Sequence, residues 1–232
     1  MNESKSDADK KRWDNRYEES GFAYGKEPNL FFKEWLQKLA PGSILMPADG
    51  EGRNGVYAAT LNWEATACDL SETGKLKALE LAKEKQVSIT YIVGDLEKLE
   101  FEQESFDVIG LIYAHFSADR KSMLHKKLQG YLKPGGLIIM EAFSKAHLDF
   151  NAINPNVGGP KEVDMLFSIA EIKADFENYE PLLLEERIVA LEEGKYHIGQ
   201  GAVIRFVGRK PMLRRTDNFT NLTKKKSSFT EP

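Results

Sequence analysis

The 232-residue sequence contains one cysteine, Cys68, and no apolar run that approaches the length of a membrane span. One cysteine excludes an internal disulfide and a zinc site built from several cysteines, and it suits a reducing compartment. A membrane helix needs about 20 predominantly apolar residues. The first twelve residues are polar and charged and lack the apolar core of a signal peptide. We therefore expect a cytoplasmic protein with no membrane partner.

Neither positive nor negative charge is in large excess. The formal net charge of −4 and a pI near 5.7 give no general attraction to nucleic acid. A hydrophobic fraction of 41% is ordinary for a packed core, and the length fits one domain. We expect this domain over residues 11–210, with a helical lid over 11–40. Residues 1–10 and the polar tail 211–232 are expected to be disordered, and the oligomeric state is left open.

Strand-like and helix-like segments alternate through the first two thirds of the chain. Helices are expected at 11–20, 28–39, 53–61, 74–85 and 119–131, and strands at 43–46, 64–68, 89–93, 106–113 and 137–143. This alternation predicts βαβ units and a parallel sheet with helices on both faces. The near-continuous apolar run Val108–Tyr113 agrees with a strand that is buried on both sides.

The pattern changes after Phe143. Residues 151–161 are rich in turn formers, and Ser168-Ile-Ala-Glu171 forms a capping box that opens a short helix. Strands are expected at 182–191 and 202–208, and their connection at 192–201 is too short for a parallel crossover. The predicted fold is therefore α/β: a Rossmann-like, doubly wound sheet of about seven strands, mostly parallel, that ends in an antiparallel pair.

A glycine-rich turn follows the first expected strand of this sheet. Its sequence, Gly50-Glu-Gly-Arg-Asn-Gly55, satisfies G-x-G-x-x-G and leads directly into a helix. Glycines allow a tight turn close to a ligand, and the helix N-terminus offers free N–H groups. Asp69 ends the next apolar run at the distance typical of a carboxylate that binds a ribose diol. These features predict an adenosine-containing cofactor, and a nicotinamide-dependent oxidoreductase is one alternative.

Five motifs resemble those of class I S-adenosylmethionine-dependent methyltransferases, in order and in spacing. They are Gly50-Glu-Gly-Arg-Asn54, Asp69-Leu-Ser71, Gly94-Asp95-Leu96, Phe106-Asp-Val108 and Leu132-Lys-Pro-Gly-Gly136. The stretches Trp13-Asp-Asn-Arg-Tyr17 and Tyr24-Gly-Lys-Glu-Pro-Asn29 are similar to the small-molecule members of the tellurite-resistance and thiopurine-methyltransferase type. The resemblance spans about residues 13–210. It implies S-adenosylmethionine as the cofactor and methyl transfer to a small-molecule acceptor as the activity.

The resemblance also implies site residues. Gly50 and Gly52 would pass beneath the methionine part of the cofactor, and Asp69 would take its ribose hydroxyls. Leu70, Asp95 and Leu96 would contact the adenine. The remaining expected cofactor contacts are Arg16 and Tyr24 in the lid, Asp49 and Asn54 beside the turn, and Ile112 beneath the sulfonium. We expect no metal ligands.

The acceptor side is less clearly marked. Tyr113 stands at the carboxyl end of the fourth expected strand, His115 follows that strand, and His197 lies in the connection between the last two strands. These three are the catalytic candidates. Arg187 and Arg205 are weaker candidates for an anionic acceptor, and His125, within a helix among lysines, is interpreted as a surface residue. A thiol, a selenide or a similar soft nucleophile needs little base catalysis, whereas an oxygen or nitrogen nucleophile would use a histidine as its base.

Two departures from the family pattern stand at the end of the first strand. Met46 occupies the position where members usually carry an acid, and Ala48 occupies a usual glycine position. We hypothesise that Asp49 supplies the missing carboxylate. The same departures leave open a methyltransferase-like binding module without activity.

Overall fold

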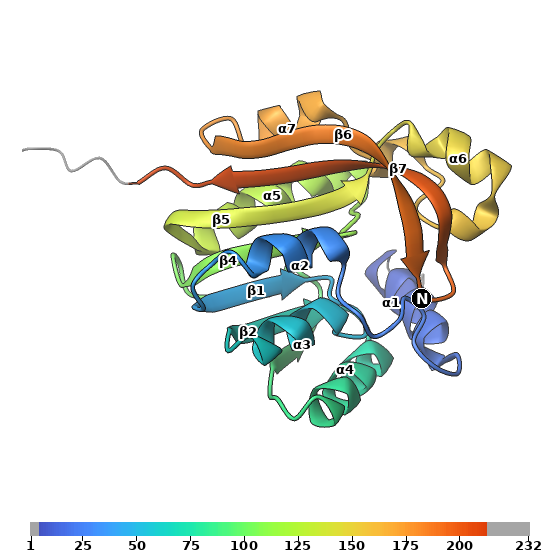
Figure 1. The fold of residues 1–232 in the computed structure, drawn as a ribbon, viewed down its shortest axis with the longest axis horizontal. Helices are drawn as coiled ribbons and strands as arrows, with labels where there is room; N and C mark the ends of the chain where they lie inside the picture. Colours follow the sequence, from blue (N-terminus) through green and yellow to red (C-terminus); the bar gives the residue numbers. More distant parts are fainter. Residues whose placement is uncertain (1–4, 213–232) are drawn as a thin grey trace, which may run out of the picture.

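The computed structural model describes residues 5–212, and these residues contain one mixed sheet of seven strands in the order β3-β2-β1-β4-β5-β7-β6 (Figure 1). The strands are β1 (Ser43–Pro47), β2 (Glu64–Asp69), β3 (Thr90–Val93), β4 (Phe106–Ile112), β5 (Leu132–Phe143), β6 (Glu180–Glu193) and β7 (His197–Arg209). The first five pair in parallel, and β7 pairs antiparallel with both β5 and β6. The predicted fold class and the antiparallel terminal pair are confirmed.

Helices cover both faces of the sheet, because both faces of its central strands are apolar. α2 (Leu30–Leu36), α3 (Arg53–Thr60) and α4 (Glu72–Glu84) lie on one face, and α5 (Ala118–Tyr131) and α7 (Ile169–Asp175) lie on the other (Figure 1). In β1, Ile44 and Met46 pack in the same cluster as Phe32 of α2, whereas Leu45 packs in the same cluster as Leu124 of α5. Successive side chains of a strand point to opposite faces, so β1 is buried on both sides.

The N-terminal helix begins earlier than the sequence predicted. α1 runs from Lys5 to Glu18, so residues 5–10, expected to be disordered, are helical. The Nζ of Lys10 pairs with the Asp14 carboxylate at 2.6 Å, an i,i+4 contact that supports this extra turn. The rings of Trp13 and Tyr17 stack with centroids 5.6 Å apart, as their spacing predicted. The expected disorder of residues 1–4 and of 213–232 lies outside the described residues.

The β6–β7 hairpin is longer than predicted, because pairing continues through the expected connection. Its ladder extends to Glu193 and His197, which are paired across a turn at residues 194–196, with Gly194 at φ +60°. The hairpin therefore projects beyond β5 and bends toward α1 (Figure 1). His197 consequently lies on a strand rather than in a loop.

The segment between β5 and α7 is also more ordered than predicted. The expected loop at 151–161 begins inside α6 (His147–Ile153) and contains the 3₁₀ turn η1 (Pro155–Val157), and η2 (Val163–Met165) follows it. Within residues 5–212, no helix combines the length and apolar character needed to cross a bilayer.

Candidate active site

The order of the strands in the sheet reverses between β1 and β4. In open α/β sheets, ligands bind beyond the carboxyl ends of the strands at this switch point. Ala48 directly follows β1 at φ +54°, and Tyr113 directly follows β4 at φ +52°. Non-glycine residues rarely adopt such angles, and they cluster at functional sites. Ala48 is exposed, so the end of β1 is open to solvent.

The glycine turn lies beside this position. Gly50 and Gly52 have φ values of +54° and +81°, and a Cβ on either residue would collide with a neighbour, the Tyr17 hydroxyl or the Ala78 side chain. Only glycine fits both the angle and the space. The Gly50 N–H donates to the Asp69 carboxylate at 3.0 Å. The structure thus brings together the glycine turn and the acid that the sequence placed there.

Asp49 is buried, and Asp69 is partly buried. Burial raises the pKa of Asp69 to about 6 and that of Asp49 to about 8. The Oδ2 atom of Asp49 accepts from the Gly55 N–H at 3.0 Å, within the first turn of α3, while its Oδ1 atom is buried without a partner among the described residues. Asp49 therefore stabilises the helix that follows the turn, and its substitution for the acid missing at Met46 stays a hypothesis.

The expected adenine contacts lie around the ends of β2 and β3. Asp95 accepts from the Ser6 hydroxyl of α1 at 2.9 Å and pairs with Arg120 of α5 at 2.5 Å. Burial alone would raise the pKa of Asp95, but these partners hold it below its usual value. Leu70 is half-buried, whereas Leu96 packs in the core with only 8% exposed. A main-chain contact from Leu96 to a ligand is compatible with this burial.

The two expected lid residues meet at the hairpin. Arg16 of α1 donates to the Tyr24 hydroxyl at 3.2 Å, and its guanidinium lies 3.8 Å from the ring centroid of Tyr196. The main chain supports this contact, because the Lys195 N–H donates to the Ala23 carbonyl at 2.8 Å. α1, the segment after it and the β6–β7 turn are therefore in contact, and we call residues 5–25 and 194–196 the lid. The expected role of the N-terminal region as a lid, over residues 11–40, stays a prediction.

Two of the three histidines near Phe143 are held by the main chain. His115 Nε2 accepts from the Phe143 N–H at 3.2 Å, so Nδ1 carries the proton and donates to the Met165 carbonyl at 2.9 Å. Burial lowers the pKa of His115 to about 4. His147 likewise accepts from the Ala202 N–H and donates to the Gly158 carbonyl. Neither ring keeps a nitrogen free for an acceptor.

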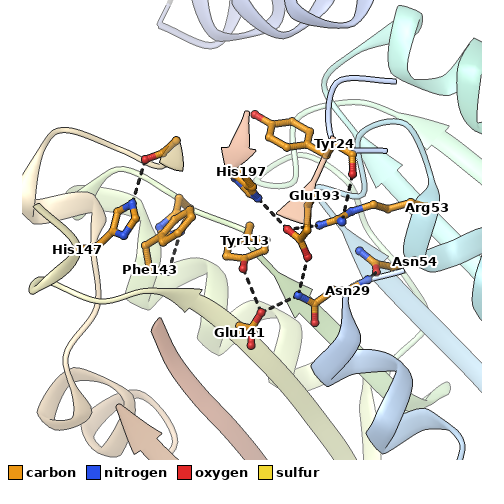
Figure 2. Close-up of polar contacts among 12 residues, drawn as sticks. Tyr24, Asn29, Arg53, Asn54, Tyr113, Glu141, Phe143, His147, Glu193 and His197 are labelled. Atoms are coloured by element: carbon orange, nitrogen blue, oxygen red, sulfur yellow. Dashed lines mark hydrogen bonds and ion pairs between the residues drawn. The ribbon is translucent and has the colours of Figure 1, made fainter. Parts of the chain in front are cut away.

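His197 is arranged differently (Figure 2). Its Nδ1 lies 2.8 Å from the Glu193 carboxylate, and its Nε2 makes no hydrogen bond within the described part of the chain. The rings of Tyr24 and Tyr113 lie 4.7 and 4.6 Å from the imidazole, centroid to centroid, and His197 is 4% exposed. Burial lowers the pKa of His197, which leaves a neutral ring with Nδ1 protonated toward Glu193.

Sequence reasoning missed the polar network around this histidine. Glu193 accepts from Arg53 at 3.1 Å and from the Asn29 side chain at 3.1 Å (Figure 2). Burial alone would raise the pKa of Glu193, but the Arg53 charge and the His197 hydrogen bond lower it to about 2. Glu141, 2% exposed on β5, accepts from Asn29 at 2.6 Å and from the Tyr113 hydroxyl at 3.1 Å.

One signal in the sequence pointed to part of this network. Glu141 is an acid inside the apolar run 137–143, where an unpaired charge would be costly. Arg205 of β7 neutralises it at 2.5 Å, which makes that arginine a structural partner. Arg187, the other weak candidate, is exposed and pairs with Glu185 of its own strand. Two residues expected to contact the cofactor border this network. Ile112, which is 7% exposed, directly precedes Tyr113. The Asn54 side chain accepts from the Asn29 N–H.

The interpretation of His125 as a surface residue is wrong. It is fully buried on the far face of the sheet, where its ring stacks on Phe167 at 5.7 Å and contacts Phe176 at 5.3 Å. Its Nδ1 lies 2.6 Å from the Asp175 carboxylate of α7. The flanking lysines indicated exposure, but α7 covers this position of α5.

Comparison with known proteins agrees with this geometry. Residues 44–136 match the family model described as a methyltransferase domain. Over these residues the chain is similar to methyltransferase domains. Over 118 residues it is 30% identical to the malonyl-[acyl-carrier protein] O-methyltransferase of Erwinia pyrifoliae, which covers 49% of this chain and 43% of that protein. The chain thus matches less than half the length of this curated relative.

Two solved structures share the fold of the methyltransferase domain at low identity. TehB from Haemophilus influenzae superposes with a TM-score of 0.62 at 18% identity, over 77% of this chain and 61% of that one. A protein studied for the conversion of a disulfide bond into a thioacetal group during echinomycin biosynthesis gives a TM-score of 0.71 at 16% identity, over 91% and 95% of the two chains. Identities this low show the common fold.

The residues of the domain fit S-adenosylmethionine. The positive φ angles of Gly50 and Gly52 leave the main-chain turn bare of side chains, and Asp69 is fixed by two main-chain N–H groups at the carboxyl end of β2. The first turn of α3 lies beyond the glycines, with its N-terminus directed at the same edge. Gly50, Gly52 and Asp69 are therefore the residues that would hold the cofactor.

Proposed function

We propose that this protein transfers a methyl group from S-adenosylmethionine to a small-molecule acceptor that carries an S–H, O–H or N–H group, with His197 as the general base. The observation that carries the proposal is the His197 ring itself. Its Nδ1 is fixed by Glu193, and its Nε2 is unbonded among the described residues, close to the switch point of a methyltransferase sheet.

The cofactor, when bound, supplies a methyl group that is already activated for displacement. The main work of the protein is therefore to place the nucleophile in line with that carbon, at about 3–3.5 Å. Ile112 ends β4 and Tyr113 directly follows it, and Tyr24 of the lid packs against the His197 ring. These residues restrict where a small acceptor can lie.

His197 would handle the proton that the acceptor loses. As the nucleophile attacks, its proton moves to the free Nε2, and the ring becomes an imidazolium. Glu193, already ionised, stabilises that charge through Nδ1–H. A general base of this kind contributes about 10²–10⁴-fold to a rate. The proton then passes to solvent when the product leaves.

Two observations favour a small acceptor. Nε2 of His197 faces the segment at Gly158, since a Cβ placed on Gly158 would lie 3.4 Å from this atom. The ring is also enclosed by Tyr24, Tyr113 and Phe143. The space around Nε2 is thus bounded by aromatic side chains and a loop. A thiol suits it best, because a thiol is both soft and protic, in keeping with the resemblance to the tellurite-resistance type.

Calorimetry followed by a turnover assay tests the proposal. S-adenosylmethionine and S-adenosylhomocysteine are each expected to bind with micromolar affinity, and NADH is expected not to bind. Release of S-adenosylhomocysteine is then measured with a panel of thiols, phenols, amines and carboxylates. Turnover with a protic acceptor supports the proposal. Binding without turnover on any acceptor would favour an inactive binding module, and binding of NADH alone would contradict the proposal.

A further inference from the structure

Arg53 is an unusual residue for the place it occupies. It is the first residue of α3, directly after Gly52 of the glycine turn, and it is 8% exposed. A cation in the first turn of a helix is electrostatically unfavourable, and burying it adds a desolvation cost. Partners must offset both costs. The guanidinium donates to the Glu193 carboxylate at 3.1 Å and to the Tyr24 carbonyl at 3.3 Å (Figure 2).

The neighbouring residue of the turn also faces the acceptor side. The Asn54 side chain accepts from the Asn29 N–H at 2.9 Å, and the Asn29 side chain donates to Glu193 at 3.1 Å. Arg53 therefore contacts the Glu193 carboxylate directly, and Asn54 is connected to the same carboxylate through Asn29. That carboxylate orients His197. The cofactor turn and the β6–β7 hairpin are joined by these contacts although they are far apart in the sequence.

We propose that Arg53 is a positioning residue that acts through Glu193 to fix the orientation and proton affinity of His197. The inference rests on the proposed function, in which His197 is the base. It assigns the arginine of the glycine-rich motif to the acceptor side of the site. A movement of the turn that displaces Arg53 would then reach His197 through the Arg53–Glu193 and Glu193–His197 contacts.

Several charged or titratable groups surround His197. They are Glu193 of β6, Arg53 of α3, Glu141 of β5, Tyr113 after β4, Tyr24 and Arg16 of the lid, and the neutral rings of His115 and His147. Glu193 raises the proton affinity of the ring, and Arg53 lowers it. Removal of Glu193 should therefore lower the midpoint of the His197 titration, and removal of Arg53 should raise it.

The test is an NMR titration of the histidine ring protons in the cofactor-free protein. The chain has four histidines, so the His197→Ala spectrum identifies the His197 signal. In Arg53→Met the His197 midpoint is expected to rise by about one pH unit, and in Glu193→Gln to fall by a similar amount. Arg209→Met is the matched control, because Arg209 pairs with Glu180 at the opposite end of the same hairpin. Its midpoint should equal that of the wild type.

A second variant guards against misfolding. Arg53→Met leaves Glu193 without its cation, and such a change can unfold a protein. Arg53→Lys keeps the charge but loses the fork that reaches both Glu193 and Tyr24, so its midpoint should move in the same direction by a smaller amount. A folded Arg53 variant with an unshifted His197 midpoint would overturn the inference. The titration needs no acceptor, so it can succeed even if methyl transfer is never observed, and the two failures are distinguishable.

The same variants connect the inference to turnover once an acceptor is found. Arg53→Met should move the acid limb of the kcat profile toward higher pH, in parallel with the NMR midpoint, while the affinity for S-adenosylhomocysteine changes by less than threefold. A loss of cofactor affinity with an unchanged pH profile would assign Arg53 to the cofactor instead and would contradict the inference.

Discussion

His197 and Glu193 face each other across the β6–β7 turn, with 2.8 Å between Nδ1 and the carboxylate. The two residues also form the last pair of the hairpin ladder, so the turn itself sets their separation. A carboxylate in this position fixes the tautomer of the ring and stabilises its protonated form. The dyad is therefore built from a local feature of the chain, and Arg53 ties it to the rest of the site.

We predict that His197→Ala and His115→Ala differ in their effect on turnover. His197→Ala should lower kcat about 100-fold or more while leaving the affinity for S-adenosylhomocysteine of the folded protein nearly unchanged. His115→Ala leaves the Phe143 N–H and the Met165 carbonyl unpaired, so it should cost about 2 kcal/mol of stability. Thermal unfolding and turnover of the two variants decide between the histidines. A larger loss of turnover in a folded His115→Ala protein would reverse the assignment.

Asp69 is predicted to be essential for binding the cofactor. Asp69→Ala removes the acceptor of the Gly50 and Ser71 N–H groups and the carboxylate expected to take the ribose hydroxyls. We expect S-adenosylhomocysteine affinity in calorimetry to fall at least tenfold, about 1.4 kcal/mol.

Asp107→Ala is the control for this loss. Asp107 lies near the amino end of β4 in the same sheet, at the opposite end of the strands from Asp69, and it pairs with Lys133 at 2.8 Å. Its removal should leave cofactor affinity unchanged. Equal losses in Asp69→Ala and Asp107→Ala would indicate general destabilisation rather than a lost ligand contact.

Much of the cofactor side was predictable because its signals are local. The glycine turn and the acid at the end of β2 are close together in the sequence. The helix and the strands around them follow from the spacing of apolar residues. Gly50 and Asp69 meet as expected because parallel neighbours β1 and β2 bring their carboxyl ends together. The same argument explains why the fold class followed from the alternation of elements.

The acceptor side depends on contacts between distant segments, and the sequence carried little sign of them. Glu193 became a candidate only when the hairpin ladder extended beyond its predicted end. His115 is a weaker candidate than His197, because the Phe143 main chain and Met165 occupy both of its ring nitrogens. His125 is buried because α7 packs over it, which the lysines beside it in sequence did not indicate.

Ala48 offers a test of backbone strain. It stands at φ +54°, an angle that costs a non-glycine residue about 1–2 kcal/mol, and it occupies a usual glycine position of the family. We predict that Ala48→Gly raises the free energy of unfolding by about 1 kcal/mol, measured by urea denaturation. Asn62→Gly is the matched control: Asn62 has φ +65°, but asparagine tolerates this region, so its gain should be smaller. A loss of stability in Ala48→Gly would show that the alanine methyl makes a compensating contact.

Asp49 predicts a pH dependence of stability. Burial raises its pKa to about 8, above the ordinary aspartate value of 3.8, so between about pH 4 and 8 the folded protein binds a proton that the unfolded chain releases. Stability should therefore fall with rising pH across this window, by up to about 1.4 kcal/mol per unit for one group. Asp49→Asn keeps an oxygen to accept from the Gly55 N–H and removes the titration.

The expected result is a flatter stability profile for Asp49→Asn, measured by urea unfolding at pH 5, 6, 7 and 8. The variant should be close to the wild type at pH 5 and more stable at pH 8. Asp69, with a pKa of about 6, contributes a similar but narrower slope that ends near pH 6, so the difference between pH 7 and 8 belongs to Asp49. Parallel profiles for the variant and the wild type over that last interval would show that Asp49 is already ionised in the folded protein. Its unpartnered Oδ1 atom would then have to be stabilised by a group other than a proton.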